Sequence, residues 1–89
     1  MPEQMTLDLS QNPIAFTPEL VTITEGESVQ FLTSDSSSKL IDIKAPTDKH
    51  FDVDIPGTFE PSEGGGNYKV TYNHKGGIAS GLIRVTHGT

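Results

Sequence analysis

Short runs of alternating apolar and polar residues are the feature that most constrains how this chain can fold. The clearest run, His50–Ile55, reads H-F-D-V-D-I, so its apolar side chains lie on one side of an extended chain and His50, Asp52 and Asp54 lie on the other. The same period of two recurs at residues 20–24, 28–32, 40–44 and 68–72. This period predicts half-buried β-strands, and the sequence contains no amphipathic helical pattern.

Turn-forming residues separate these runs. Gly26 between two runs predicts a hairpin over residues 20–32, the polar stretch Ser34–Ser38 predicts a surface loop, and Gly64–Gly66 predicts a turn. Short strands at a spacing of roughly 8–12 residues are typical of an all-β antiparallel Greek-key β-sandwich, and an immunoglobulin-like sandwich is the alternative.

The length of 89 residues allows one modest core, so we expect a single domain over residues 1–89, with an ordered core from about residue 5 to about residue 86. The alternation predicts the residues that face this core: Val21, Ile23, Val29, Phe31, Ile41, Ile43, Phe51, Val53, Tyr68, Val70, Ile83 and Val85.

The segment from Gly66 to Val85 resembles the copper-loop end of the cupredoxins, the family of plastocyanin and azurin. In that family a strand of the form G-x-Y-x-(apolar)-x-C is followed by a loop with His and Met and then by G-x-I-x-V. Gly66, Tyr68 and Gly81 fit this frame, and the stretch from Phe16 to Phe31 is similar to the amino-terminal half of the family. The resemblance implies a cupredoxin-like sandwich in which the Tyr68 ring points inward and its hydroxyl bonds to a loop.

The same frame lacks the copper chemistry. The chain contains no cysteine, and the cysteine position of the frame is Tyr72, or Thr71 if the frame is anchored on His74. Met1 and Met5 lie at the far end of the sequence from the copper loop. A type 1 copper site requires a thiolate together with imidazoles, so we expect no copper and no other cofactor.

Charge excludes one class of partner. The formal net charge is −6 with only six Lys and Arg residues, whereas nucleic-acid binding needs clustered cations. No apolar run is long enough for membrane insertion, and the first residues lack a signal pattern. We expect a periplasmic or secreted protein if a signal has been removed and a cytoplasmic one otherwise; the sequence does not indicate an oligomeric state.

A metal-handling role is the alternative function. His50, Asp52 and Asp54 place three potential ligands on one strand face, and His74 lies in the loop where the family concentrates function. A hydrated outer strand face is the simpler explanation of the first three residues, and we favour it over a ligand group. Catalysis is not indicated, because no serine stands beside a histidine and no phosphate-binding motif follows the glycine run. We therefore expect that the protein is not an enzyme.

The main hypothesis is a copper-free interaction or structural module that binds a protein partner through the loops at the former copper end. These loops are predicted at residues 11–18, 34–40 and 74–80. The candidate partner-binding residues are Lys39, Tyr72, His74 and Lys75. The cations among them would form a positive island on an acidic protein and attract an acidic partner. For Tyr72 we favour a packing role, in which its ring fills volume near the former metal position, over a role in partner binding.

Overall fold

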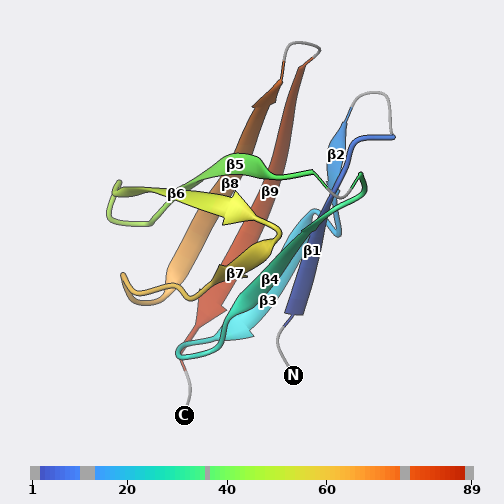
Figure 1. The fold of residues 1–89 in the computed structure, drawn as a ribbon. Helices are drawn as coiled ribbons and strands as arrows, with labels where there is room; N and C mark the ends of the chain where they lie inside the picture. The colour runs from blue at the N-terminus through green and yellow to red at the C-terminus, as the bar shows by residue number, and fades with distance from the viewer. Residues whose placement is uncertain (1–2, 11–13, 36, 75–76, 88–89) are drawn as a thin grey trace.

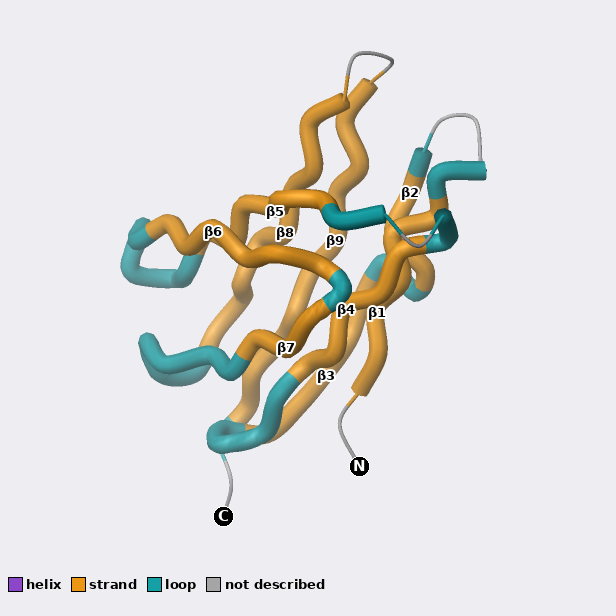
Figure 2. Tube along the Cα trace, viewed as in Figure 1, coloured by secondary structure: helices purple, strands orange, loops and turns teal. Residues whose placement is uncertain are grey.

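A computed structural model describes residues 3–10, 14–35, 37–74 and 77–87, except for the side chain of His74. This part of the chain consists of strands and loops without a helix (Figure 2). It therefore includes no helix with the length and apolar character needed to cross a membrane. The strands are β1 (Glu3–Asp8), β2 (Ala15–Thr17), β3 (Leu20–Thr24), β4 (Val29–Thr33), β5 (Lys39–Lys44), β6 (His50–Ile55), β7 (Gly57–Phe59), β8 (Gly66–His74) and β9 (Gly77–Thr86).

The strands form a two-layered sandwich (Figure 1). One sheet has the strand order β2-β1-β4-β7, and the other has the order β3-β9-β8-β5-β6. The chain crosses repeatedly between the sheets, because neighbours in sequence such as β2 and β3, or β7 and β8, belong to different layers. The all-β sandwich predicted from the alternation is confirmed.

Each sheet contains a parallel pair, which corrects the expectation of purely antiparallel strands. β1 runs parallel to β4, from the pair Glu3 and Val29 onward, and β3 runs parallel to β9, from the pair Leu20 and Leu82 onward. Parallel neighbours require a long crossover connection. The repeated passage between layers supplies such connections, and it cannot be read from the alternation within single strands.

The predicted hairpin over residues 20–32 is wrong. β3 pairs with β9 and β4 pairs with β1 and β7, so the turn after Thr24 connects the two layers. Thr24 and Glu27 fix this turn: the Glu27 N–H donates to the Thr24 carbonyl at 3.0 Å, and the Thr24 N–H donates to the Glu27 carboxylate at 2.7 Å. The apolar faces of both strands point into the core. Strands in opposite layers bury these faces as well as a hairpin would, so the alternation does not distinguish the two arrangements.

One hydrophobic cluster fills the space between the sheets. All the predicted core residues are buried in it except Phe51 and Val53, which are half-buried on β6 and pack against the cluster. The cluster also contains residues that alternation did not identify, namely Met5, Phe16, Ala45, Phe59 and Ala79. Phe59 contacts Phe51 with ring centroids 5.7 Å apart and Tyr68 with centroids 6.1 Å apart, and aromatic pairs are favourable at such distances.

Tyr68 anchors the loop between β7 and β8. Its side chain is fully buried, and its hydroxyl donates to the Gly64 carbonyl at 2.8 Å and accepts from the Glu63 N–H at 2.9 Å. Burial raises the pKa of the phenol above its ordinary value. The inward ring and the loop-bonded hydroxyl implied by the family resemblance are confirmed.

Candidate functional site

The β8–β9 hairpin forms much of the candidate end of the sandwich. Asn73 pairs with Ile78 and His74 with Gly77, so both strands continue through residues expected to lie in a loop over 74–80 (Figure 1). Lys75 and Gly76 lie outside the described residues. In the expected loop over 11–18, residues 15–17 form β2, which pairs with β1. Among the described residues, strands β2, β8 and β9 therefore extend into the segments expected as loops at 11–18 and 74–80, whereas residues 34, 35, 37 and 38 lie outside strands as expected.

Tyr72 lies in the core at this end. Its side chain is only 8% exposed, and it pairs across the hairpin with Ala79, which is also buried. Tyr72 therefore packs in the hydrophobic core, and its side chain exposes little surface that a partner could contact.

This environment does not fit a type 1 copper site. A phenol ring occupies the position where the cupredoxin frame has its cysteine, the chain has no thiolate elsewhere, and Ala79 has no donor atom in its side chain.

Lys39 begins β5 and is engaged by the loop before it. Its ammonium group lies 3.4 Å from the Asp35 carboxylate and also contacts the Ser37 hydroxyl, and its side chain is 20% exposed. Hydrogen bonds from Ser37, with a smaller contribution from Lys39, hold the pKa of Asp35 below its ordinary value. The charge of Lys39 is therefore compensated locally. His74 lies on β8 without a described side chain, so the expected positive island has no uncompensated cation among the described residues at this end.

Two large apolar side chains are exposed near the hairpin. Leu40 on β5 is 56% exposed and Ile78 on β9 is 59% exposed. Asn73 pairs with Ile78 across the β8–β9 hairpin, and Asn73 and Leu40 line the same pocket. We call Leu40, Asn73 and Ile78 the end patch. Its members lie on the outer face of the five-stranded sheet, where Asn73 connects Ile78, its partner on β9, with Leu40, its neighbour in the pocket lining.

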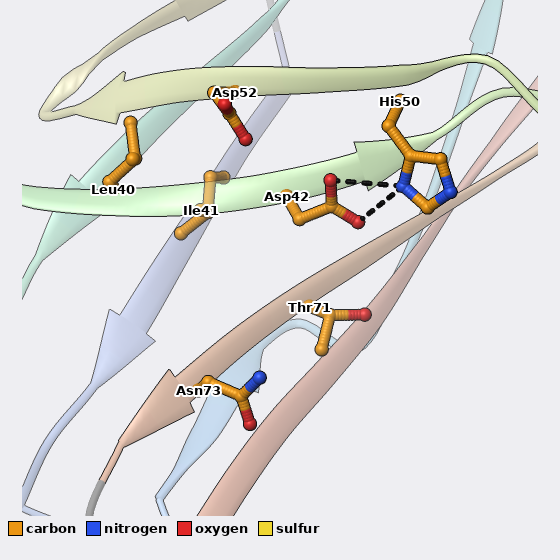
Figure 3. Close-up of a pocket in the computed structure, with 7 residues that line it drawn as sticks. All are labelled: Leu40, Ile41, Asp42, His50, Asp52, Thr71 and Asn73. Atoms are coloured by element: carbon orange, nitrogen blue, oxygen red, sulfur yellow. Dashed lines mark hydrogen bonds and ion pairs between the residues drawn. The ribbon is translucent and has the colours of Figure 1, made fainter.

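A pocket of about 340 Å³ adjoins the end patch on the same face (Figure 3). We call it the acidic pocket, and its lining comes from β5, β6 and β8: Leu40, Ile41, Asp42, His50, Asp52, Thr71 and Asn73. The His50 Nδ1 atom lies 3.0 and 3.1 Å from the two oxygens of Asp42. This volume falls within the range of sites that accept small groups.

The carboxylates of the acidic pocket face each other across the β5–β6 ladder. Asp42 and Asp52 are direct cross-strand partners, and Asp54 pairs with Leu40 in the next row. Asp52 makes no side-chain hydrogen bond or ion pair with the described residues, whereas Asp42 is bonded to His50. Like charges directly opposite on neighbouring strands repel each other, so this arrangement favours a cation between them.

The structure places the candidate metal ligands as follows. His50, Asp52 and Asp54 share the exposed face of β6, as their alternation indicates, but His50 bonds to Asp42 of β5. The described residues contain no group of three or more His, Cys, Asp or Glu side chains arranged to hold a metal ion. His87 follows the end of β9 opposite the hairpin tip, roughly 30 Å away at the ordinary rise of a strand, and pairs with Glu25.

Sequence reasoning did not identify Asp42, Thr71, Asn73, Leu40 or Ile78 as candidate site residues, although Leu40 and Ile78 fall within the loops predicted at residues 34–40 and 74–80. The alternation in residues 40–44 does place Leu40 and Asp42 opposite the buried Ile41 and Ile43. What the sequence does not contain is the register that brings Asp42 beside Asp52 and Asn73 beside Ile78.

Comparison with known proteins supports the fold. No family model and no curated protein matches the sequence. Among solved structures, a purple cupredoxin from Nitrosopumilus maritimus superposes with a TM-score of 0.60 at 18% identity, covering 94% of this chain and 99% of that one. A pseudoazurin from Hyphomicrobium denitrificans superposes with a TM-score of 0.59 at 13% identity, covering 96% of this chain and 75% of that one. The chain thus has a cupredoxin-like fold that lacks the ligands of a type 1 copper site.

Proposed function

We propose that this protein is a non-enzymatic, copper-free cupredoxin-like module that binds a protein partner through the end of the sandwich where β5 begins and β8 meets β9. The single observation that carries the proposal is the end patch. Leu40 and Ile78 are each more than half exposed; Ile78 pairs with Asn73, and Asn73 lines a pocket together with Leu40. Lys39 and His74 adjoin Leu40 and Asn73 in the sequence, but the ammonium group of Lys39 is paired with Asp35, and Lys75 lies outside the described residues.

The grouping of Leu40 and Ile78 matters more than their exposure. Single apolar side chains are common on protein surfaces and need no explanation, whereas apolar side chains gathered with polar neighbours are typical of an interaction surface. Leu20 on β3 is 51% exposed and offers an internal comparison, because it lies on the same sheet beside Leu82, four residues along β9 from Ile78. Burial of Leu40 and Ile78 by a partner would contribute about 25 cal/mol for each Å² of apolar area removed from water.

The proposal is tested by capturing partners on immobilised protein and identifying them by mass spectrometry. We expect the double variant Leu40→Glu/Ile78→Glu to lose the specific partner, because two carboxylates would have to be buried in an apolar contact. The matched control is Leu20→Glu, which makes the same chemical change at similar exposure away from the end patch. Thermal unfolding of each variant verifies that the fold is intact. Equal capture by the double variant and the parent protein would contradict the proposed function.

A further inference from the structure

The outer face of the five-stranded sheet is divided by charge. In the rows nearest the β8–β9 tip lie the end patch and three carboxylates, those of Asp42, Asp52 and Asp54. The cations Lys44, Lys69 and Arg84 lie in the rows farther from the tip. Lys44 is paired with Asp48 at 3.5 Å. The described groups near the end patch therefore give a negative potential, and His50 is the only histidine, lysine or arginine among the residues that line the acidic pocket.

The acidic pocket and the end patch form one continuous surface. Leu40 and Asn73 belong to both, so a molecule that covers the end patch also reaches the pocket. The side chains of Thr71 and Asn73 make no hydrogen bond with the described residues, which leaves a hydroxyl and an amide available beside the carboxylates. Figure 3 shows Asp42 and Asp52 on adjacent strands with Leu40 nearby.

We infer that this combined surface binds a basic segment of a protein partner, with a lysine or arginine side chain entering the acidic pocket and neighbouring apolar side chains covering Leu40 and Ile78. The inference rests on the proposed function and specifies the chemistry of the partner. Charge complementarity selects a basic partner over the acidic one expected from the sequence, because Lys39 is neutralised by Asp35 while Asp52 has no counterion among the described residues. An entering cation would also relieve the repulsion between Asp42 and Asp52.

The end patch favours a polypeptide over a free small amine. A single ammonium or guanidinium group can fill the acidic pocket, but it leaves Leu40 and Ile78 in water. A peptide that alternates apolar and basic residues contacts both regions at once. Binding to the two regions together is expected to be tighter than binding of the cation alone, because the apolar contact adds to the charge-assisted hydrogen bonds.

The test uses the full chain and a short synthetic peptide of alternating leucine and arginine, with affinity measured by titration and the contact surface mapped by backbone amide NMR shifts. We expect shifts at the end patch, Asp42 and Asp52. Neutralising the pocket with Asp52→Asn is expected to weaken binding by about fivefold, the upper range for an exposed ion pair. The control Glu3→Gln removes an exposed carboxylate from the other sheet and is expected to leave affinity unchanged. Raising the ionic strength from about 0.1 M to about 1 M is expected to weaken binding.

Three comparison ligands make the inference falsifiable. A leucine–glutamate peptide that binds as tightly as the leucine–arginine peptide would overturn the basic-partner assignment. Ethylguanidinium that binds as tightly as the leucine–arginine peptide would overturn the assignment to a polypeptide. A glycine–arginine peptide that binds as tightly as the leucine–arginine peptide would overturn the inferred contact between the partner's apolar side chains and Leu40 and Ile78. If Asp52→Asn binds the leucine–arginine peptide as tightly as the parent protein does, while Leu40→Glu/Ile78→Glu loses the captured partner, the inference fails and the proposed function stands. If the basic peptide binds the pocket but the double variant retains its partner, the proposed function fails instead.

Discussion

The inner face of the five-stranded sheet carries Ile41, Ile43, Val70 and Ile83, all buried in the common core, whereas the outer face of the same strands carries a segregated mixture of acids, cations and exposed apolar residues. On the inner face each strand contributes apolar side chains whichever strand lies beside it. On the outer face the chemistry depends on which residues become neighbours. The inner face therefore stabilises the fold, and the outer face carries the surface through which we propose that the protein binds a partner.

The largest expected effect is on the inner side of the sandwich. Phe31 is fully buried on β4, so Phe31→Ala is expected to lower the free energy of unfolding by about 3–5 kcal/mol, through lost transfer energy and a residual cavity. Denaturant unfolding measures this change. Near-parental stability of the variant would show that Phe31 contributes little to the core, and it would weaken the contrast between the two faces.

A smaller loss is expected when only a polar contact of the core is removed. Tyr68→Phe keeps the ring but deletes the hydroxyl that bonds the Glu63 N–H and the Gly64 carbonyl, and leaving such groups unpaired costs about 1–3 kcal/mol. Thermal or denaturant unfolding measures the loss. Because burial raises the pKa of Tyr68, the parent protein is also expected to lose stability as the pH rises above about 10, where the unfolded phenol ionises first. The variant should show a weaker loss over that pH range, and an unchanged profile would exclude Tyr68 as its source.

The contrast between the inner and outer faces of the sheet also explains which features of the fold could be predicted from the sequence. Period-two alternation locates Val29 and Phe31 in the core without knowledge of their partners, and the family resemblance identifies the inward Tyr68. Phe59 was missed because its short strand β7 lies among turn-forming residues. Neither the layer of β3 nor that of β4 could be predicted, since the same inward faces suit a hairpin and a crossing between sheets.

The candidate site was predicted only in outline for a related reason. The expected end of the sandwich contains the end patch, but the glycines at 76 and 77 suggested a loop where Ile78 is already on a strand. Asp52 was recognised as outward-facing, yet its interaction with Asp42 depends on the β5–β6 register, which pairs residues ten apart across a turn. Single-strand patterns determine the face of a residue. They do not determine its neighbour on the next strand.

The smallest expected effect has the opposite sign. Asp52→Asn removes the repulsion between directly opposed carboxylates, so we expect it to raise the free energy of unfolding by about 0.2–1 kcal/mol, the usual range for a cross-strand pair. Asp54→Asn is the matched control, because Asp54 lies opposite Leu40 and should change stability less. Denaturant unfolding at low ionic strength measures both variants, since salt screens the repulsion. If Asp52 served only to stabilise the fold, Asp52→Asn would lower the free energy of unfolding. That result would contradict our assignment of Asp52 to binding. Stabilisation of the free protein together with weaker binding of a basic peptide would instead show that Asp52 lowers stability and favours a cationic ligand.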